Sequence, residues 1–543
     1  MLNTVLLYLT LTSIPCNCLK HVRPLISSSM SLLFQSLLIT LVCLPIAAGI
    51  LARLSGPALA GRLVTSAAAT AMGLAFLGGI LLCFYGPQTA RWAPYGEDAA
   101  FAFALRLDAV SAIMVMLVTF LGAVVLRFSQ RYLAGDPHQA RFFSWMSLTL
   151  GSVVLLVLSG HLLLLLAAWV STSLCLHRLL LHFPERSGAV FSARKKFVIS
   201  RLGDLCLLGA ALSLHAQHHT FDMGAIFAGL SEGRTSGVAT AGLLLAGCAM
   251  LKSAQFPFHS WLPDTMETPT PVSAFMHAGI INGGGFLVVR LAPVFAQAPQ
   301  ASHLLAVAGA LTAAFGAVVM LAQPSVKRAL AYSTIAQMGF MILQCGLGAY
   351  GLALLHIAAH SLYKAHAFLN AGSTIGAVPR AAVPLRTPAL TFGVLLGGLL
   401  VALGSTAAHA LAPMSPAPSW LFGVVLALGV AYGLARVWSS GGGVRTLVRG
   451  VVACASITVL SLALHMLAST LSANLPTIQT PLALLVAVAS IFAGLFLFQA
   501  LLWRANRHPF GRRLYVHALN GFYVGTVLNR ILGRLWPRQH SAA

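Results

Sequence analysis

Long apolar runs follow one another along almost the whole chain, separated by short polar segments. A helix needs about 20 apolar residues to cross a bilayer, and about fifteen runs of roughly this length follow Leu32. Each run therefore predicts one membrane-spanning helix, and the chain is expected to be an all-α polytopic membrane protein with about 14–15 such helices. The runs cover residues 32–53, 63–85, 103–126, 142–159, 162–182, 197–217, 237–256, 271–297, 302–322, 326–347, 350–372, 388–411, 419–438, 446–470 and 480–502.

Basic residues follow alternate runs, and this alternation predicts the orientation. The loops between them, such as 159–161 and 472–479, contain no lysine or arginine. Cytoplasmic loops carry an excess of positive charge, so the N-terminal side is expected outside and the C-terminus in the cytoplasm. The acidic loop after the seventh run is the exception, and we expect it to pack inside the protein. The basic loop residues include Arg53, Arg127, Arg194, Lys195, Lys196, Lys327, Arg328, Arg445 and Arg512.

The two ends of the chain differ from the region between them. Residues 1–29 hold a short apolar stretch interrupted by prolines and basic residues, so they are expected to be a secretory signal or a dispensable extension before a natural start at Met30. Residues 30–505 form the expected transmembrane domain. Residues 506–543 form a cytoplasmic tail, amphipathic from Arg512 to Trp536, which either lies on the membrane surface or docks a partner.

Composition excludes several classes of protein. Charged residues make up 8% of the chain, against about a quarter in ordinary globular domains, so no soluble domain fits. The net charge of +23 is spread over short loops, which argues against nucleic-acid binding. Most cysteines lie inside apolar runs, and the chain has no P-loop, dinucleotide fingerprint or CxxC pair. We expect no cofactor and no disulfide framework.

The segment 251–290 departs from a plain spanning helix. Lys252 ends an apolar run, and Pro257 follows it. Asp264 and Glu267 then lie between prolines. His277 stands in the next apolar stretch, which Gly283 to Gly285 interrupt again. Broken helices and ionisable groups at membrane depth are tolerated only where they line a protein-lined or wet pathway. The pattern predicts broken helices near residues 252–285 beside such a pathway.

Lys252 has no acidic residue three or four positions away on its own helix. Burial without a counter-ion favours a neutral amine and makes this lysine a candidate proton relay. The alternative is a lysine that reaches towards the membrane interface. His277, alone on an apolar helix, would ordinarily be a core histidine, and gains interest from the broken helix and Lys252 beside it.

A second polar stripe lies in the eleventh run. His356, His360 and Lys364 are spaced four residues apart and share one helix face. Imidazoles beside a lysine are suited to passing protons. A His-x3-His pair could instead bind a metal, but no further ligand is evident and the neighbouring lysine disfavours a cation, so no metal site is expected.

The remaining charged residues are expected to be structural. Arg201 and Asp204 lie three residues apart and can form an ion pair on one helix face. Asp264 and Glu267 are expected to pair with basic residues, and Asp108 is expected at the membrane interface.

The residues from Lys252–Ser253–Ala254–Gln255 to Pro269–Thr270–Pro271 and on to His277 resemble the antiporter-like subunits of respiratory complex I and the Mrp sodium/proton antiporters. The resemblance extends over roughly residues 100–400, and includes the Arg201–Asp204 pair and the histidine–lysine helix. It implies an antiporter-like fold. It also implies that Lys252, His277, His360 and Lys364 translocate protons or cations.

Two departures narrow the resemblance. Val170 follows Trp169 where that family carries a glutamate, and residues 388–411 lack the charged residue of the twelfth helix. Together with SQRYLAGDP (129–137) and the tail 514–537, these features resemble the DabB family, membrane subunits of bacterial inorganic-carbon transporters.

That resemblance implies a multi-pass protein of the bacterial inner membrane that is not itself an enzyme. A gradient of H+ or Na+ would drive CO2 hydration by a DabA-type zinc-containing partner subunit. The alternative function is a proton- or cation-pumping subunit of a complex I-like or Mrp-type assembly. A quinone- or NADH-handling oxidoreductase would need a cofactor motif that the sequence lacks.

Overall fold

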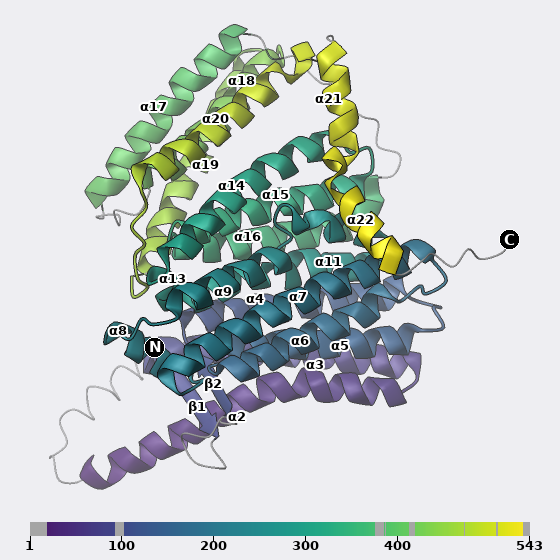
Figure 1. The fold of residues 1–543 in the computed structure, drawn as a ribbon, viewed down its shortest axis with the longest axis vertical. Helices are drawn as coiled ribbons and strands as arrows, with labels where there is room; N and C mark the ends of the chain where they lie inside the picture. Colours follow the sequence, from purple (N-terminus) through teal and green to yellow (C-terminus); the bar gives the residue numbers. More distant parts are fainter. Residues whose placement is uncertain are drawn as a thin grey trace.

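The computed structural model describes residues 19–92, 103–374, 385, 387–411, 419–471, 473–505 and 509–535. Long helices lie side by side and follow one another through the molecule in roughly chain order, from purple to green in Figure 1. Each of the fifteen predicted runs contains a helix. Their bounds are α2 (Leu19–Leu54), α3 (Pro57–Tyr85), α4 (Ala109–Tyr132), α5 (Gln139–Leu158), α6 (Leu162–Leu180), α7 (Ser187–His218), α9 (Val238–Lys252), α11 (Thr270–Ala278) with α12 (Gly283–Arg290), α14 (Pro299–Ala322), α15 (Val326–Gly346), α16 (Tyr350–Leu369), α17 (Thr387–Leu411), α18 (Ser419–Ser439), α19 (Val444–Leu471) and α20 (Leu482–Ala505).

Within the described residues, 12 helical stretches are long and apolar enough to cross a membrane. Of the fifteen predicted runs, three contain helices that do not meet this criterion. They are α9, which is shorter, and α15 and α16, which carry more polar residues. The predicted polytopic helical fold is therefore confirmed. The predicted domain boundary at Met30 falls within α2, which runs without interruption from Leu19, and residues 1–18 lie outside the described residues.

One prediction of a helix start was wrong. Residues 103–107 form strand β2 (Phe103–Leu107), which pairs antiparallel with β1 (Gln88–Trp92). The short apolar run could not be distinguished from a helical one by its pattern alone. The helix α4 starts after Asp108, whose carboxylate accepts a hydrogen bond from the Ser111 amide in a capping box.

The segment after α9 is broken twice within residues 252–285, as predicted, although the second break is not at the glycines. Short helical turns follow Lys252: η1 (Phe258–Ser260), α10 (Trp261–Asp264) and η2 (Thr265–Glu267). The second break is at η3 (Ile280–Asn282), before the glycines rather than at them. The glycines begin α12, where a Cβ at Gly284 would overlap Ser253 and one at Gly283 would lie 3.4 Å from Lys252 Cε. They allow close packing rather than breaking the helix.

The helices α14 and α15 pack backbone against backbone. A Cβ at Gly316 would lie 2.6 Å from the Ala336 nitrogen, and one at Gly346 would lie 2.6 Å from the Ser302 carbonyl oxygen. Small residues in membrane helices permit this close approach. These two helices form a tightly joined pair beside α11 and α12.

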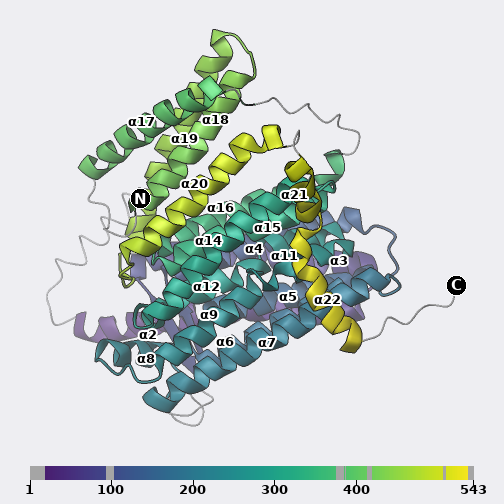
Figure 2. The ribbon, with the colours of Figure 1, turned by 45° about the horizontal axis from the view of Figure 1, so that its top comes forward.

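The C-terminal helices form two further parts. The helices α17 to α20 stand at one side of the bundle, joined to it by contacts of α19 with α16 and of α20 with α14 (Figures 1 and 2). The tail is two helices rather than the single amphipathic helix predicted. They are α21 (Pro509–Leu519) and α22 (Val524–Leu535), separated by a kink where Phe522 and Tyr523 have φ of 51° and 60°.

The tail packs on the protein along one side. Gln323 Nε2 donates to the Leu519 carbonyl oxygen at 3.2 Å, and the two tail helices cross the helical bundle near the ends of its helices (Figures 1 and 2). On α22, Val527 and Ile531 remain exposed. The remaining short elements are α8 (Met223–Ser231), α13 (Ala292–Ala296) and η4 (Ala371–Thr374).

Candidate functional site

Lys252 occupies the last position of α9, where the helix breaks. Its Nζ lies 4.5 Å from the centre of the Trp169 ring on α6, a distance typical of a cation–π contact. None of the ion pairs within the described residues includes Lys252, so neither another helix nor the acidic loop supplies a paired carboxylate there.

Lys252 lines a small cavity of about 20 Å³ together with residues of α7. Its lining includes Trp169, Lys196, Ser200 and Trp261, and it has room for about one water molecule. Lys196 is buried there, and its Nζ donates hydrogen bonds to the Ser173 carbonyl oxygen at 2.8 Å and to Ser173 Oγ at 2.9 Å. The cavity therefore brings two lysines from two helices to one point.

The assignment of Lys195 and Lys196 to a cytoplasmic loop was wrong. Both lysines lie within α7, with side chains that are 0% and 4% exposed. The helix begins ten residues earlier than predicted because its first turns contain small and polar residues that an apolar run does not register. The absence of proline between 187 and 218 was the signal for a continuous helix.

Arg201 and Asp204 form the predicted pair, with 2.7 Å between Arg201 Nη2 and Asp204 Oδ2, although the angles do not make this contact a hydrogen bond. The charge on Asp204 also acts on both Lys196 and Lys252.

A second group of polar residues lies between α11, α15 and α16. His277 Nδ1 is 3.0 Å from Thr334 Oγ1, and its ring stacks on Phe368 at 4.4 Å. Lys364 is fully buried, and its Nζ donates to the Leu330 carbonyl oxygen at 3.0 Å. The ring nitrogen His277 Nε2 is buried and has no hydrogen-bond partner within the described part of the chain.

The histidines of α16 lead from this group to a larger cavity. The rings of His356 and His360 are 6.0 Å apart, and His360 interacts electrostatically with both His277 and Lys364. His356 Nδ1 pairs with Gln344 Oε1 at 2.9 Å. A cavity of about 390 Å³ begins at His356, and Ser405 of α17, Ser461 and His465 also line it. The twelfth predicted helix thus contributes a hydroxyl to this cavity.

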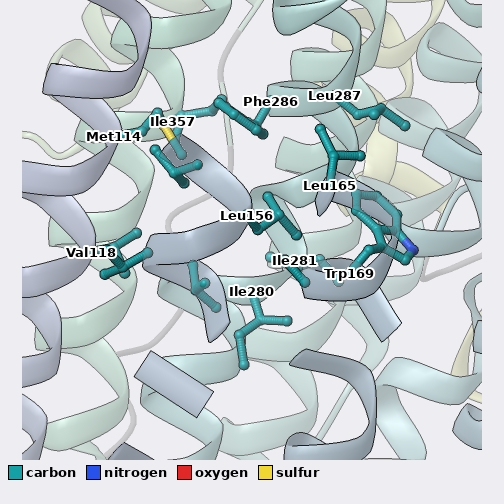
Figure 3. Close-up of a cluster of buried hydrophobic side chains, with 14 of the residues drawn as sticks. Met114, Val118, Leu156, Leu165, Trp169, Ile280, Ile281, Phe286, Leu287 and Ile357 are labelled. Carbon is teal, nitrogen blue, oxygen red and sulfur yellow. The ribbon is translucent and has the colours of Figure 1, made fainter. Parts of the chain in front are cut away.

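Asn282 lies in the break between α11 and α12, and it was not recognised from the sequence. Its Nδ2 donates to the Ala278 carbonyl oxygen at 2.7 Å and to Ser361 Oγ on α16 at 2.9 Å. Around it, Ile280, Ile281 and Trp169 belong to a cluster of buried apolar side chains (Figure 3). A buried amide between two helical pieces is costly unless it is hydrogen-bonded, and its position in the break was the available signal.

The acidic loop faces a polar cavity of about 680 Å³ at one end of the bundle. Lys195 Nζ lies 2.8 Å from Asp264 Oδ2 and also donates to Asn529 Oδ1 of α22 at 2.7 Å and to the Ser260 carbonyl oxygen at 3.2 Å. Glu267 is 3.9 Å from Arg186 and half exposed. Both carboxylates have a basic partner, and the loop borders a cavity rather than being fully enclosed.

Asp108 joins the strand β2 and α4 to the end of α12. Arg290 Nη1 donates to Asp108 Oδ2 at 2.6 Å, and Arg106 lies at 3.0 Å. Burial alone would raise the pKa of Asp108, but Arg290, the Ser111 amide and Arg106 together lower it to about 2. The two arginines therefore keep this carboxylate ionised.

Within the described residues, no group of three or more histidines, cysteines or carboxylates is placed to hold a metal ion. The candidate site consists of amines, imidazoles, hydroxyls and amides. Such groups can bind and pass protons.

Two family models match the chain. One, described as the transmembrane part of NADH:quinone oxidoreductase and Mrp antiporters, matches residues 159–387. This range contains all five candidate relay residues. The other, described as the N-terminus of complex I chain 5, matches residues 92–143.

Two solved structures share the fold. The Mrp complex from Dietzia sp. contains a chain with a TM-score of 0.64 at 24% identity, covering 92% of this chain and 59% of that one. An archaeal membrane-bound sulfane sulfur reductase gives a TM-score of 0.56 at 17% identity, covering 84% and 75%. These likenesses confirm the predicted antiporter-like fold.

Curated relatives decide the family. The probable inorganic carbon transporter subunit DabB of Hydrogenovibrio crunogenus is 42% identical over 340 residues, which are 61% of this chain and 65% of that protein. The probable inorganic carbon transporter subunit DabB2 of Halothiobacillus neapolitanus is 38% identical over 457 residues, 81% of each chain. The chain therefore belongs to the DabB family, within the larger group of complex I and Mrp antiporter-like membrane subunits.

Proposed function

We propose that this protein is the ion-translocating membrane subunit of an inorganic-carbon transporter in the bacterial inner membrane. In this proposal an ion gradient drives the hydration of CO2 by a DabA-type zinc-containing partner, which supplies the enzymatic chemistry. The names of the DabB relatives support the substrate class. The observation that carries the proposal is a fully buried lysine, Lys364, whose Nζ donates to a neutral carbonyl oxygen, beside two buried histidines.

The arrangement supports a relay with two parts. Lys252 and Lys364 are the protonatable amines, and His277 and His360 lie beside Lys364. In this proposal the Asn282–Ser361 hydrogen bond is the polar crossing between the two parts, since the neighbouring Gly283 packs close to Lys252, with its Cβ position 3.4 Å from Lys252 Cε. An uncompensated charge at membrane depth is costly, so each group holds a proton only transiently unless another charge compensates it.

The chemistry of these groups favours protons over Na+. Sodium is held by several oxygen ligands, as are other hard cations, whereas amines and imidazoles bind protons at accessible pH. Within the described residues, Lys364 hydrogen-bonds one carbonyl oxygen and His277 hydrogen-bonds one hydroxyl. We therefore take H+ as the coupling ion.

The alternative is a pumping subunit of a complex I-like or Mrp-type assembly, which the fold similarity to the Dietzia Mrp complex favours. Two features weigh against it. Val170 stands where those subunits carry a glutamate, and the α17 residue lining the larger cavity is the uncharged Ser405. Co-purification distinguishes the two assemblies, because the proposal requires a zinc-containing partner.

The test is inorganic-carbon uptake in cells that depend on this transporter. Lys252→Ala and Lys364→Ala should abolish uptake and CO2-dependent growth at unchanged membrane levels of the protein. Arg449→Ala removes an exposed basic residue of α19 and serves as the control. Unchanged uptake in both lysine variants would refute the relay.

A gain of charge tests the neighbourhood of Lys252. Val170→Glu adds a carboxylate one residue from Trp169, whose ring contacts Lys252. The new charge should hold the lysine protonated and reduce uptake, with Val170→Gln as the uncharged control. Equal uptake by both variants would mean that position 170 does not act on Lys252.

A further inference from the structure

Lys196 is buried beside Lys252 and has no part in the relay described above. Resting on the proposed function, we propose that Lys196 is a second proton-holding group, which exchanges a proton with Lys252 across the one-water cavity between α7 and α9. This residue could not be selected from its local pattern, because it stands in a basic cluster typical of a loop.

The geometry brings the two amines to one cavity. Both side chains line the space of about 20 Å³, which has room for about one water molecule. Lys196 Nζ is held by the carbonyl oxygen and the hydroxyl of Ser173, at 2.8 and 2.9 Å. These two acceptors leave one of the three ammonium hydrogens for the cavity.

The balance of charge prevents both lysines from being protonated together at low cost. Asp204 acts on both amines, but it already pairs with Arg201 at 2.7 Å. With both amines protonated, the group of four side chains would carry an excess of two positive charges in a buried site. Uncompensated buried charge is costly, so the pair favours sharing a single proton.

The other titratable groups that act on the pair do not remove this excess. Cys175 and His177 of α6 interact electrostatically with Lys196, and Cys248 of α9 interacts electrostatically with Lys252. As thiols and a neutral imidazole they carry no negative charge. A protonated histidine would add to the repulsion.

The exchange is a simple proton transfer. An N–H bond of the Lys252 ammonium breaks as the cavity water takes its proton, and that water gives one of its protons to the free amine of Lys196. One N–H bond breaks and one forms, the water gains and loses one O–H bond, and no group is oxidised or reduced. Lys252 is then neutral and able to accept the next proton.

A structural role predicts something different. If Lys196 only ties α7 to α6 through Ser173, any donor that reaches Ser173 should replace it. Lys196→Arg keeps a donor and a charge but cannot release a proton at accessible pH. Lys196→Gln keeps a donor without the charge.

The experiment measures uptake of labelled inorganic carbon as a function of external pH, with the partner subunit present and each variant normalised to its membrane level. Both substitutions should lower uptake by about tenfold or more, since each removes a positioned acid–base group. In Lys196→Gln the alkaline limb of the residual activity should move up by about one pH unit or more, because Lys252 loses a neighbouring positive charge. Arg449→Ala, which removes an exposed basic residue of α19 that does not line this cavity, should leave both quantities unchanged.

Recovery of normal uptake in Lys196→Arg would overturn the proposal in favour of a structural role, as would normal uptake with an unshifted profile in Lys196→Gln. If the glutamine variant does not accumulate, the arginine variant decides. Failure of the proposed function gives a separate result, because Lys252→Ala and Lys364→Ala would then also retain uptake.

Discussion

Lys195 ties three parts of the molecule together, and its removal gives a sharp prediction. Its side chain is 0% exposed and donates to Asp264 of the broken segment, to Asn529 of α22 and to the Ser260 carbonyl oxygen. Lys195→Met removes all three hydrogen bonds while preserving most of the side-chain volume. We expect it to destabilise the protein and to release the tail.

The magnitude follows from these contacts. Breaking a buried ion pair costs about 3–5 kcal/mol when the remaining charge stays buried. Here Asp264 is 27% exposed and borders the cavity of about 680 Å³, so water can solvate it after the substitution. We therefore expect a loss of about 2 kcal/mol. Asn529→Leu removes one of the three acceptors and should cost about 1 kcal/mol.

The assay is unfolding of the detergent-solubilised protein, followed by tryptophan fluorescence, together with the rate of tryptic cleavage in α21 at Arg512 and Arg513. Lys195→Met should lower the unfolding midpoint and speed cleavage, and adding Asn529→Leu to it should cost little more because the contact is already lost. Arg530→Ala, on the exposed side of α22, is the control. Additive effects of Lys195→Met and Asn529→Leu would refute the shared contact.

Three further predictions test the fold and the crossing. The pKa of Asp108 in the folded protein, about 2, lies below its ordinary value of 3.8. Its contribution of about 2 kcal/mol to the free energy of unfolding should therefore be present above pH 4 and lost as the pH falls towards 2. The difference in stability between wild type and Asp108→Asn should shrink over that interval. Gly339→Val should overpack α15 against the α14 backbone, cost about 2–3 kcal/mol and lower the thermal midpoint in detergent. Gly423→Ala, with open space around its Cβ, should leave the midpoint unchanged. Equal midpoints for the two variants would contradict the close packing. Asn282→Leu should reduce uptake by about tenfold at unchanged membrane level, while costing only about 1–2 kcal/mol through the lost hydrogen bond to Ser361; normal uptake would exclude Asn282 from the crossing.

The apolar runs predicted the helices because bilayer thickness sets their length and their hydrophobicity together. The length and hydrophobicity of a run did not reveal the strand β2, because five residues are too few to show whether the period is helical or extended. It also missed the first ten residues of α7, since a helix covered by other protein segments can begin with polar and basic residues that find partners there. Lys195 and Lys196 were misplaced for this reason.

The candidate site was partly predictable because charge is rare at membrane depth. Lys252, His277, His360 and Lys364 stood out on this ground, and His277, His360 and Lys364 lie together in the fold. Their roles in translocation stay predictions. Asn282 and the Ser173–Lys196 contact depend on which helices are neighbours, and this information comes from tertiary packing rather than from any local pattern.

The glycine contacts between α14 and α15 limit which helices can move during a transport cycle. Sliding or rotating either helix would drive one main chain into the other, so the two behave as a single rigid strut. Thr334 and the Leu330 carbonyl, which hold His277 and Lys364, belong to that strut. If the proposed cycle of proton uptake and release moves helices in this polar group, the movement would fall to α11 and α16, and their hydrogen bonds would break and form against the fixed α14–α15 pair.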